Sequence, residues 1–204
     1  MNAHAYRYAI AYKPFNLLCA NKDRYGRPAL VDMGIPRTLH AAGRLVLDSE
    51  GLLLLTDDGA LLHCVTHPDF NHPKTYLALV VGQPADAILQ WLRDGVELKD
   101  GITRPADVEA LPSAPSLPPF PRPLPAPSKT MWLRIVLYEG KKRQIKRMLS
   151  AVGMPIIRLV RVAIGPLTLP HDLEPGQWRN LTAAERTALL EWVGPRSGAW
   201  ELPD

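Results

Sequence analysis

Residues 133–153 read LRIVLYEGKKRQIKRMLSAVG, and this stretch predicts a strand, a turn and a helix in succession. The β-branched and apolar run Trp132–Tyr138 is typical of a buried strand, which Glu139 and Gly140 end. After the turn, four apolar residues recur with the spacing of one buried helical stripe. These four are Ile145, Met148, Leu149 and Val152. Gly153 can end that helix in a left-handed conformation.

Most other positions around this junction are cationic. They are Lys141, Lys142, Arg143, Lys146 and Arg147. Arg158 and Arg161 follow shortly afterwards. A cationic helix surface on its own is equally typical of a solvated face. Here the cations gather at a single strand-to-helix junction with few carboxylates among them, which favours contact with the phosphates of a polyanion.

The composition indicates an ordinary soluble globular protein, and we expect one domain spanning residues 1–204. The hydrophobic fraction is 47% of 204 residues, which is ample for a core. The net charge of +4 is only modestly basic, so the position of the cations indicates an anionic partner more than their sum does. Cys19 and Cys64 are expected to be reduced, buried thiols. Because no signal peptide and no long apolar run is found, we expect a cytoplasmic protein without a membrane partner, with a monomer as the default.

Strands and helices mix along the rest of the chain without strict alternation, which favours the α+β class. Strands are expected at residues 6–12, 52–56, 74–81, 96–98, 106–111 and 154–164, and residues 17–20 form a second short apolar piece after a turn. Helices are expected at residues 60–65, 85–93 and 183–193. The acidic turn at Asp57 and Asp58 supplies the first of these helices with an N-cap. Thr182 and Glu185 form a capping box at the start of the last one.

Residues 112–127 contain eight prolines among sixteen residues. Proline removes backbone donors and forbids regular helix, so we expect a surface loop of polyproline character. A docking peptide for a proline-reading module, or a proline-rich scaffold, is the alternative.

The loop between Gly43 and Gly51 carries charged side chains directly ahead of a buried strand. They are Arg44, Asp48 and Glu50. Functional groups often occupy such anchored loops, although a solvated turn has the same composition. Lys74 and Tyr76 share one side of a strand, where the ring could stack on a base or simply pack in the core.

No cofactor is expected. The residues His63, Cys64, His67 and His72 lack the spacing of a zinc site. Ser49 is not in a nucleophile elbow. The glycines do not form a phosphate-binding loop of the nucleotide-binding type, so neither a metal nor a nucleotide cofactor is predicted.

Several stretches together resemble the RsuA-type pseudouridine synthases of ribosomal RNA. They are Gly43-Arg-Leu45, Asp48-Ser-Glu-Gly-Leu-Leu-Leu-Leu-Thr-Asp-Asp-Gly59, Lys74-Thr-Tyr76, Glu139-Gly-Lys-Lys-Arg-Gln-Ile-Lys-Arg-Met148, Tyr12-Lys-Pro-Phe-Asn16 and Leu173-Glu-Pro-Gly-Gln-Trp-Arg179. By this resemblance we expect the chain to begin at the catalytic core, without the S4 domain that many members carry. That feature and the proline-rich segment make it most similar to the RluE subgroup, which acts on large-subunit ribosomal RNA.

The resemblance implies a two-lobed domain around a central mixed sheet and an RNA-binding cleft. It also implies a cofactor-free isomerase that turns a uridine out of the helical stack, breaks its glycosidic bond and rejoins the base through carbon. Tyr76 would stack on the target base, Arg44 would displace it and Ile145 would line the pocket. Lys146 would pair with the catalytic aspartate. The cations expected to contact RNA are Arg44, Lys141, Lys142, Arg143 and Arg147.

The chain departs from the family pattern at Val46, which stands where the catalytic aspartate follows Gly-Arg-Leu. Valine has no nucleophilic or acid-base group. Either the chain is inactive or severely impaired, or a rebuilt loop uses Asp48. In the first case we expect Lys146 to turn toward Asp48, Glu139 or solvent. A catalytically inactive RNA-binding or ribosome-assembly protein is then the rival function.

Overall fold

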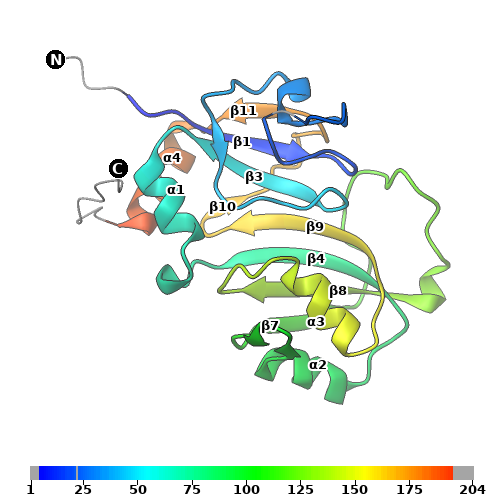
Figure 1. Cartoon of the computed structure of the whole chain (residues 1–204). Coiled ribbons are helices and arrows are strands. Elements are labelled where there is room, and N and C mark those ends of the chain that lie inside the picture. Colours follow the sequence, from blue (N-terminus) through cyan, green and yellow to red (C-terminus); the bar gives the residue numbers. More distant parts are fainter. Residues whose placement is uncertain (1–4, 22, 195–204) are drawn as a thin grey trace.

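The structure is a computed structural model that describes residues 5–21 and 23–194, and a nine-stranded sheet dominates it (Figure 1). The central path runs, in spatial order, through β11 (Trp178–Asn180), β1 (Tyr8–Lys13), β3 (Glu50–Thr56), β9 (Ile156–Ile164), β4 (Lys74–Val81), β8 (Thr130–Leu137) and β7 (Asp107–Leu111). The short strands β2 (His40–Ala41) and β10 (Leu167–Thr168) join β3 and β9. Only the β3–β9 pair among them is parallel, so the expected mixed α+β sheet is confirmed.

Strand β3 explains the run of four consecutive leucines at residues 52–55, all fully buried. Successive side chains point to opposite faces of a strand. Leu52 and Leu54 therefore pack on one face in a cluster with Tyr8 and Ile10 of β1. Leu53 and Leu55 pack on the other face with the segment that follows β1. A strand covered on both faces loses the usual polar alternation.

In the described part of the chain, four α-helices cover this sheet in two groups (Figure 1). The pair α2 (Asp86–Asp94) and α3 (Gln144–Ala151) packs on β4, β7 and β8 through one apolar cluster. The pair α1 (Gly59–Thr66) and α4 (Ala183–Val193) contributes to the cluster on β1 and β3. The two groups divide the sheet into two halves that meet at β9.

Capping explains where two of these helices begin. The Asp58 carboxylate accepts a hydrogen bond from the Leu61 amide at the start of α1. At the start of α4, the Thr182 hydroxyl accepts from the Glu185 amide, and the Glu185 carboxylate accepts from the Thr182 amide. Both N-caps are those that the sequence predicted, and α4 has the expected bounds.

The contact between the two halves requires a glycine at the parallel β3–β9 pairing. Gly51 lies opposite Arg161, and its φ of 106° is a left-handed value that favours glycine. A Cβ at this position would lie 2.2 Å from the Arg161 carbonyl oxygen. The loop that carries Asp48 therefore enters β3 through a fixed close approach to β9.

Several expectations differ from the structure at the edges of the fold. The short apolar piece at residues 17–20 makes a single bridge, from Leu18 to Ala29. The hairpin of β5 (Glu97–Leu98) and β6 (Gly101–Ile102) was expected only as a strand and a turn. Strands β2, β10 and β11 were not predicted, since two or three residues carry too little periodicity.

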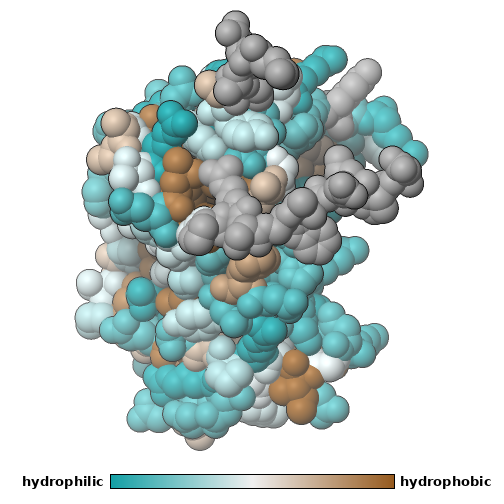
Figure 2. Space-filling view, turned by 90° about the vertical axis from the view of Figure 1, so that its left-hand side faces the viewer, coloured by the Kyte–Doolittle hydropathy of each residue, from teal (hydrophilic) through white to brown (hydrophobic). Residues whose placement is uncertain are grey.

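The surface seen in Figure 2 is mainly hydrophilic, with hydrophobic residues in small separate groups. Among the described residues, no helix is long and apolar enough to cross a membrane. The segment between β7 and β8 contains no strand, and its one regular piece is a short 3-10 turn at Pro127–Lys129. It is an extended loop, as the eight prolines predict.

Candidate active site

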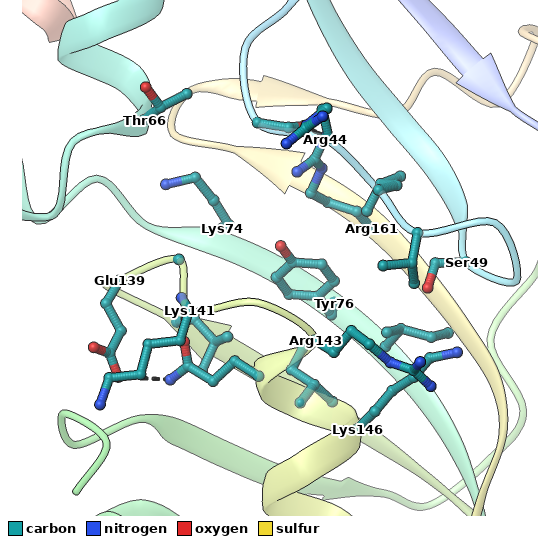
Figure 3. Close-up of a pocket in the computed structure, with 18 residues that line it drawn as sticks. Arg44, Ser49, Thr66, Lys74, Tyr76, Glu139, Lys141, Arg143, Lys146 and Arg161 are labelled. Carbon is teal, nitrogen blue, oxygen red and sulfur yellow. Dashed lines mark hydrogen bonds between the residues drawn. The ribbon is translucent and has the colours of Figure 1, made fainter. Parts of the chain in front are cut away.

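A cavity of about 180 Å³ lies where the two halves of the sheet meet. Its walls come from the loop that begins at Gly43, from β4 and from the start of α3 (Figure 3). Seven of the residues that the family resemblance placed in the site line it. They are Arg44, Val46, Tyr76, Lys141, Arg143, Ile145 and Lys146. The aromatic ring and part of the expected cationic cluster thus line one cavity.

Strand β4 places Lys74 and Tyr76 on the same side, and both line the cavity. Tyr76 is partly buried and touches the apolar clusters of both halves, so it is at once a packing residue and a wall of the cavity. Lys74 is only 7% exposed and donates a hydrogen bond to the His72 carbonyl. Burial, with the neighbouring Arg161 charge, lowers the pKa of Lys74 to about 8.

Two of the expected RNA contacts lie elsewhere. Arg147 forms a bidentate ion pair with Asp100, with distances of 2.6 and 3.1 Å, and does not line the cavity. Arg147 is therefore not part of this cavity, and its contact with RNA stays a prediction. Lys142 is exposed but also lies outside the cavity. Lys141 reaches the cavity, although its ammonium group is bonded to carbonyls of the β5–β6 hairpin.

Arg158 and Arg161 are structural, which corrects the expectation that they contact phosphate. Arg158 is 4% exposed and forms a buried bidentate ion pair with Glu50, at 2.8 and 2.9 Å. Arg161 is 1% exposed and donates to the carbonyls of Leu52 and Gly43, both at 2.8 Å. These two arginines hold both ends of the loop at residues 43–50.

Lys13 holds the middle of the same loop. Its fully buried ammonium group donates to the carbonyls of Leu47 and Ser49, at 3.1 and 2.7 Å, and also to the Pro14 carbonyl. Burial lowers the pKa of Lys13 to about 8. Because the two loop carbonyls flank Asp48, the backbone on both sides of that residue is fixed.

The Asp48 carboxylate lies 2.5 Å from the ammonium group of Lys146. Partial burial alone would raise the pKa of Asp48, but the hydrogen bond and charge of Lys146 outweigh it and hold that pKa below its ordinary value. Of the three arrangements expected for Lys146, the structure has the one with Asp48. Asp48 itself is half exposed and lines a neighbouring cavity, whereas Val46 lines the central one.

Glu139 is the carboxylate that lines the central cavity, and it already accepts hydrogen bonds from protein groups. Glu139 is 8% exposed and accepts hydrogen bonds from the Gln144 side chain and from the Arg104 amide, at 2.6 and 2.8 Å. It lies on the far side of Tyr76 from Lys146 (Figure 3). No cluster of histidine, cysteine and acidic residues in the described part of the chain could hold a metal ion.

Sequence reasoning missed the three cations that brace the loop, and only one of them left a signal. The signal is the position of Lys13, which directly continues a buried apolar run and precedes a proline. An exposed lysine can have the same neighbours in the sequence, so this signal is weak. The partners of Arg158 and Arg161 are more than 100 residues distant in the sequence, so no local pattern identifies them.

The sequence profile described as RNA pseudouridylate synthase matches residues 7–151 of this chain. A protein of Xanthomonas campestris pv. campestris named ribosomal large subunit pseudouridine synthase E is 49% identical over 172 residues, covering 82% of this chain and 91% of that protein. A protein of the same name from Vibrio vulnificus is 44% identical, covering 85% of this chain and 74% of its own. These relatives agree with the subgroup expected from the sequence.

A solved structure described as a pseudouridylate synthase superposes with a TM-score of 0.76 at 29% sequence identity, covering 93% of this chain and 76% of the other. The likeness in fold and the likeness in sequence point to the same group of isomerases. This chain therefore belongs to the RNA pseudouridylate synthase family.

Proposed function

We propose that this chain acts on a uridine of large-subunit ribosomal RNA, with the everted base against Tyr76. The cavity combines an aromatic ring with cations that have no carboxylate partner among the described residues, Arg44 and Arg143. Extruding a base costs a few kcal/mol, which contacts to the base and to the phosphates must offset. The names of the relatives from Xanthomonas and Vibrio support the large subunit as the source of the RNA.

Our proposal about turnover rests on one observation, namely that the side chain of Val46 lines the cavity. Isomerisation requires a group that helps to break and remake the glycosidic bond, and Val46 supplies none. Asp48 lies two residues further along, roughly 6 to 7 Å in an extended chain. Moving it into place would break the hydrogen bonds from Lys13 that fix its flanking carbonyls. We infer that RNA binding is retained while turnover is severely impaired.

The test is tritium release from ribosomal RNA labelled at carbon 5 of uracil, on this chain and on Val46→Asp. A misplacement of about 1 Å already costs on the order of a hundredfold in rate, so we expect Val46→Asp to be at least about a hundredfold faster. Val46→Asn is the matched control, because asparagine has the shape of aspartate but no acidic group. It should give no gain in the rate of tritium release. Equal rates for this chain and Val46→Asp would contradict the inference about Val46.

A second function is favoured by the same residue, namely a non-catalytic RNA-binding protein that takes part in ribosome assembly. Asp48→Asn separates the two. If this chain has residual turnover that Asp48→Asn abolishes, Asp48 is a working substitute and the chain is a slow enzyme. If this chain binds the RNA with undetectable turnover, and Asp48→Asn leaves binding unchanged, the non-catalytic function is favoured.

A further inference from the structure

A second cavity of about 360 Å³ adjoins the central one, and the proposed function does not use it. The two cavities share Arg143 and Lys146 as walls, so the Asp48–Lys146 ion pair lies at their boundary. The outer wall of the second cavity includes Phe15 and Arg122. Arg122 comes from the proline-rich segment 112–127, which the proposed function also leaves unexplained.

The charges of the second cavity do not cancel. Asp48 is neutralised by Lys146, and Arg158 by Glu50. Arg122 and Arg143 have no carboxylate within ion-pair distance among residues 5–21 and 23–194. Both are exposed, so two guanidinium groups face this space with their charge uncompensated.

The proline-rich segment holds Arg122 at this wall. Phe120 packs edge-on against Phe15, with ring centroids 5.1 Å apart, and also lies 5.1 Å from the buried Arg158 guanidinium group. The Arg122 guanidinium group stacks over the Phe15 ring at 4.6 Å. Prolines on both sides of Arg122 restrict the backbone, which lowers the entropy lost on ordering it.

Stacking leaves the donors of a guanidinium group free, because they lie in its plane and point away from its edge. Arg122 thus combines a fixed position with an unused fork of N–H donors, which suits the oxygens of a phosphate. In Figure 1 the segment leaves the sheet after β7 and loops out before it returns to β8. The segment between the edge strand β7 and its neighbour β8 therefore supplies a wall for the site at the junction of the two halves.

We propose that the second cavity binds the phosphodiester group of a nucleotide next to the target uridine, between Arg122 and Arg143. This inference rests on the proposed function, because it takes the central cavity as the place of the target. It makes Arg122 a positioning residue for the RNA. The proline-rich segment is then part of the substrate site and not a docking peptide for another protein.

The test measures the binding of an unmodified large-subunit ribosomal RNA transcript by filter retention at several salt concentrations. The variants are Arg122→Lys, Arg122→Ala and Arg122→Glu. Arg186→Ala is the matched control, because Arg186 is also exposed and stacks on a tyrosine, at the distant α4. We expect Arg122→Ala to weaken binding about fivefold to tenfold at low salt and to lower the log-log salt slope by about 0.7.

The charge series separates a phosphate contact from a packing role. A phosphate contact predicts affinities that fall in the order Arg, Lys, Ala, Glu, with the control unchanged. Equal losses for Lys, Ala and Glu would assign Arg122 a packing role and overturn the proposal, as would an affinity that does not change. If this chain does not bind the transcript at all, the proposed function itself fails, which is a different result from binding that ignores position 122.

Discussion

Lys146 and Asp48 form an ion pair at 2.5 Å on the rim of the central cavity, while Val46, on the same loop, faces the interior. By the family resemblance, Lys146 would pair with a catalytic carboxylate. Its partner in this structure is Asp48, which does not line the central cavity. The pair also removes the cost of an unpartnered cation that is only 12% exposed.

We expect Lys146 to change partners when an acid is restored. In the Val46→Asp background, Asp48→Asn should change the single-turnover rate by less than about threefold, since the introduced carboxylate replaces Asp48 as partner. Lys146→Met in that background should lower the rate about a hundredfold or more, because it removes the charge that orients the acid. Lys129→Met is the control, as Lys129 is exposed and outside the cavity. An equal loss for Asp48→Asn and Lys146→Met would refute the change of partner.

Tyr76 should contribute to RNA affinity through its ring and not through its hydroxyl. Stacking of a base on an aromatic side chain is worth about 1 to 3 kcal/mol. We expect Tyr76→Phe to bind the transcript normally and Tyr76→Leu to lose affinity by that amount. Leucine keeps most of the apolar packing between the two clusters, so a loss reports stacking. Equal affinities for Tyr76→Leu and Tyr76→Phe would count against the base-stacking role.

Lys13 should control the rigidity of the loop at residues 46–49. Lys13→Met removes hydrogen bonds from a charged group to the Leu47 and Ser49 carbonyls, each worth about 1.5 to 3 kcal/mol. We expect hydrogen exchange of the loop amides to accelerate by about tenfold or more, measured by mass spectrometry. Lys129→Met, in the loop before β8, is the control and should leave this exchange unchanged. Unaltered protection in Lys13→Met would contradict the bracing role.

The two buried lysines should make the protein more stable as the pH rises from about 8 to about 10. Lys13 and Lys74 have a pKa of about 8 in the folded protein and an ordinary pKa of 10.5 when exposed, so the unfolded chain binds more protons in this window. The free energy of unfolding then rises with pH, by up to about 1.4 kcal/mol per pH unit for each lysine. Above that window Tyr12, with a pKa raised to about 12, acts in the opposite direction.

Urea denaturation at intervals between pH 7.5 and pH 9.5 measures this dependence. Lys74→Met should remove the part of the rise in unfolding free energy that Lys74 contributes, because methionine fills a similar space and has no titratable group. A flat profile in the unchanged chain would exclude the depressed pKa values of both lysines.

The capping box of α4 should stabilise the protein in a pH-dependent way. Thr182→Ala removes the bond to the Glu185 amide and should cost about 1 kcal/mol, whereas Thr182→Ser should cost little. The Arg179 ion pair, together with the Thr182 amide, lowers the pKa of Glu185 to about 2. Its stabilisation is therefore complete above pH 4.5 and is lost as the pH falls toward 2. Acid titration of Glu185→Gln, which should lack this loss, provides the measurement.

The sequence alone determined those elements whose physics is local. Strand β4 has the expected bounds, and so does α4 with its capping box, because side-chain period and capping involve residues a few positions apart. Helix α3 begins at Gln144 and ends at Ala151, with Val152 as its C-cap, close to the extent that the apolar stripe from Ile145 to Val152 predicted. The family motifs likewise indicated the cavity, since Tyr76 and Lys146 both line it.

Only the tertiary structure decided which cations are free and which are structural. Arg158 and Glu50 are 108 residues apart in the sequence and form a buried pair, and Arg147 is neutralised by Asp100 of a hairpin 47 residues earlier. A charged residue contributes equally to the composition and to the local sequence pattern whether its side chain is buried and paired or exposed and unpaired. Its role depends on the dielectric and the partners that folding places around it, and these are properties of the packed sheet and not of any one segment.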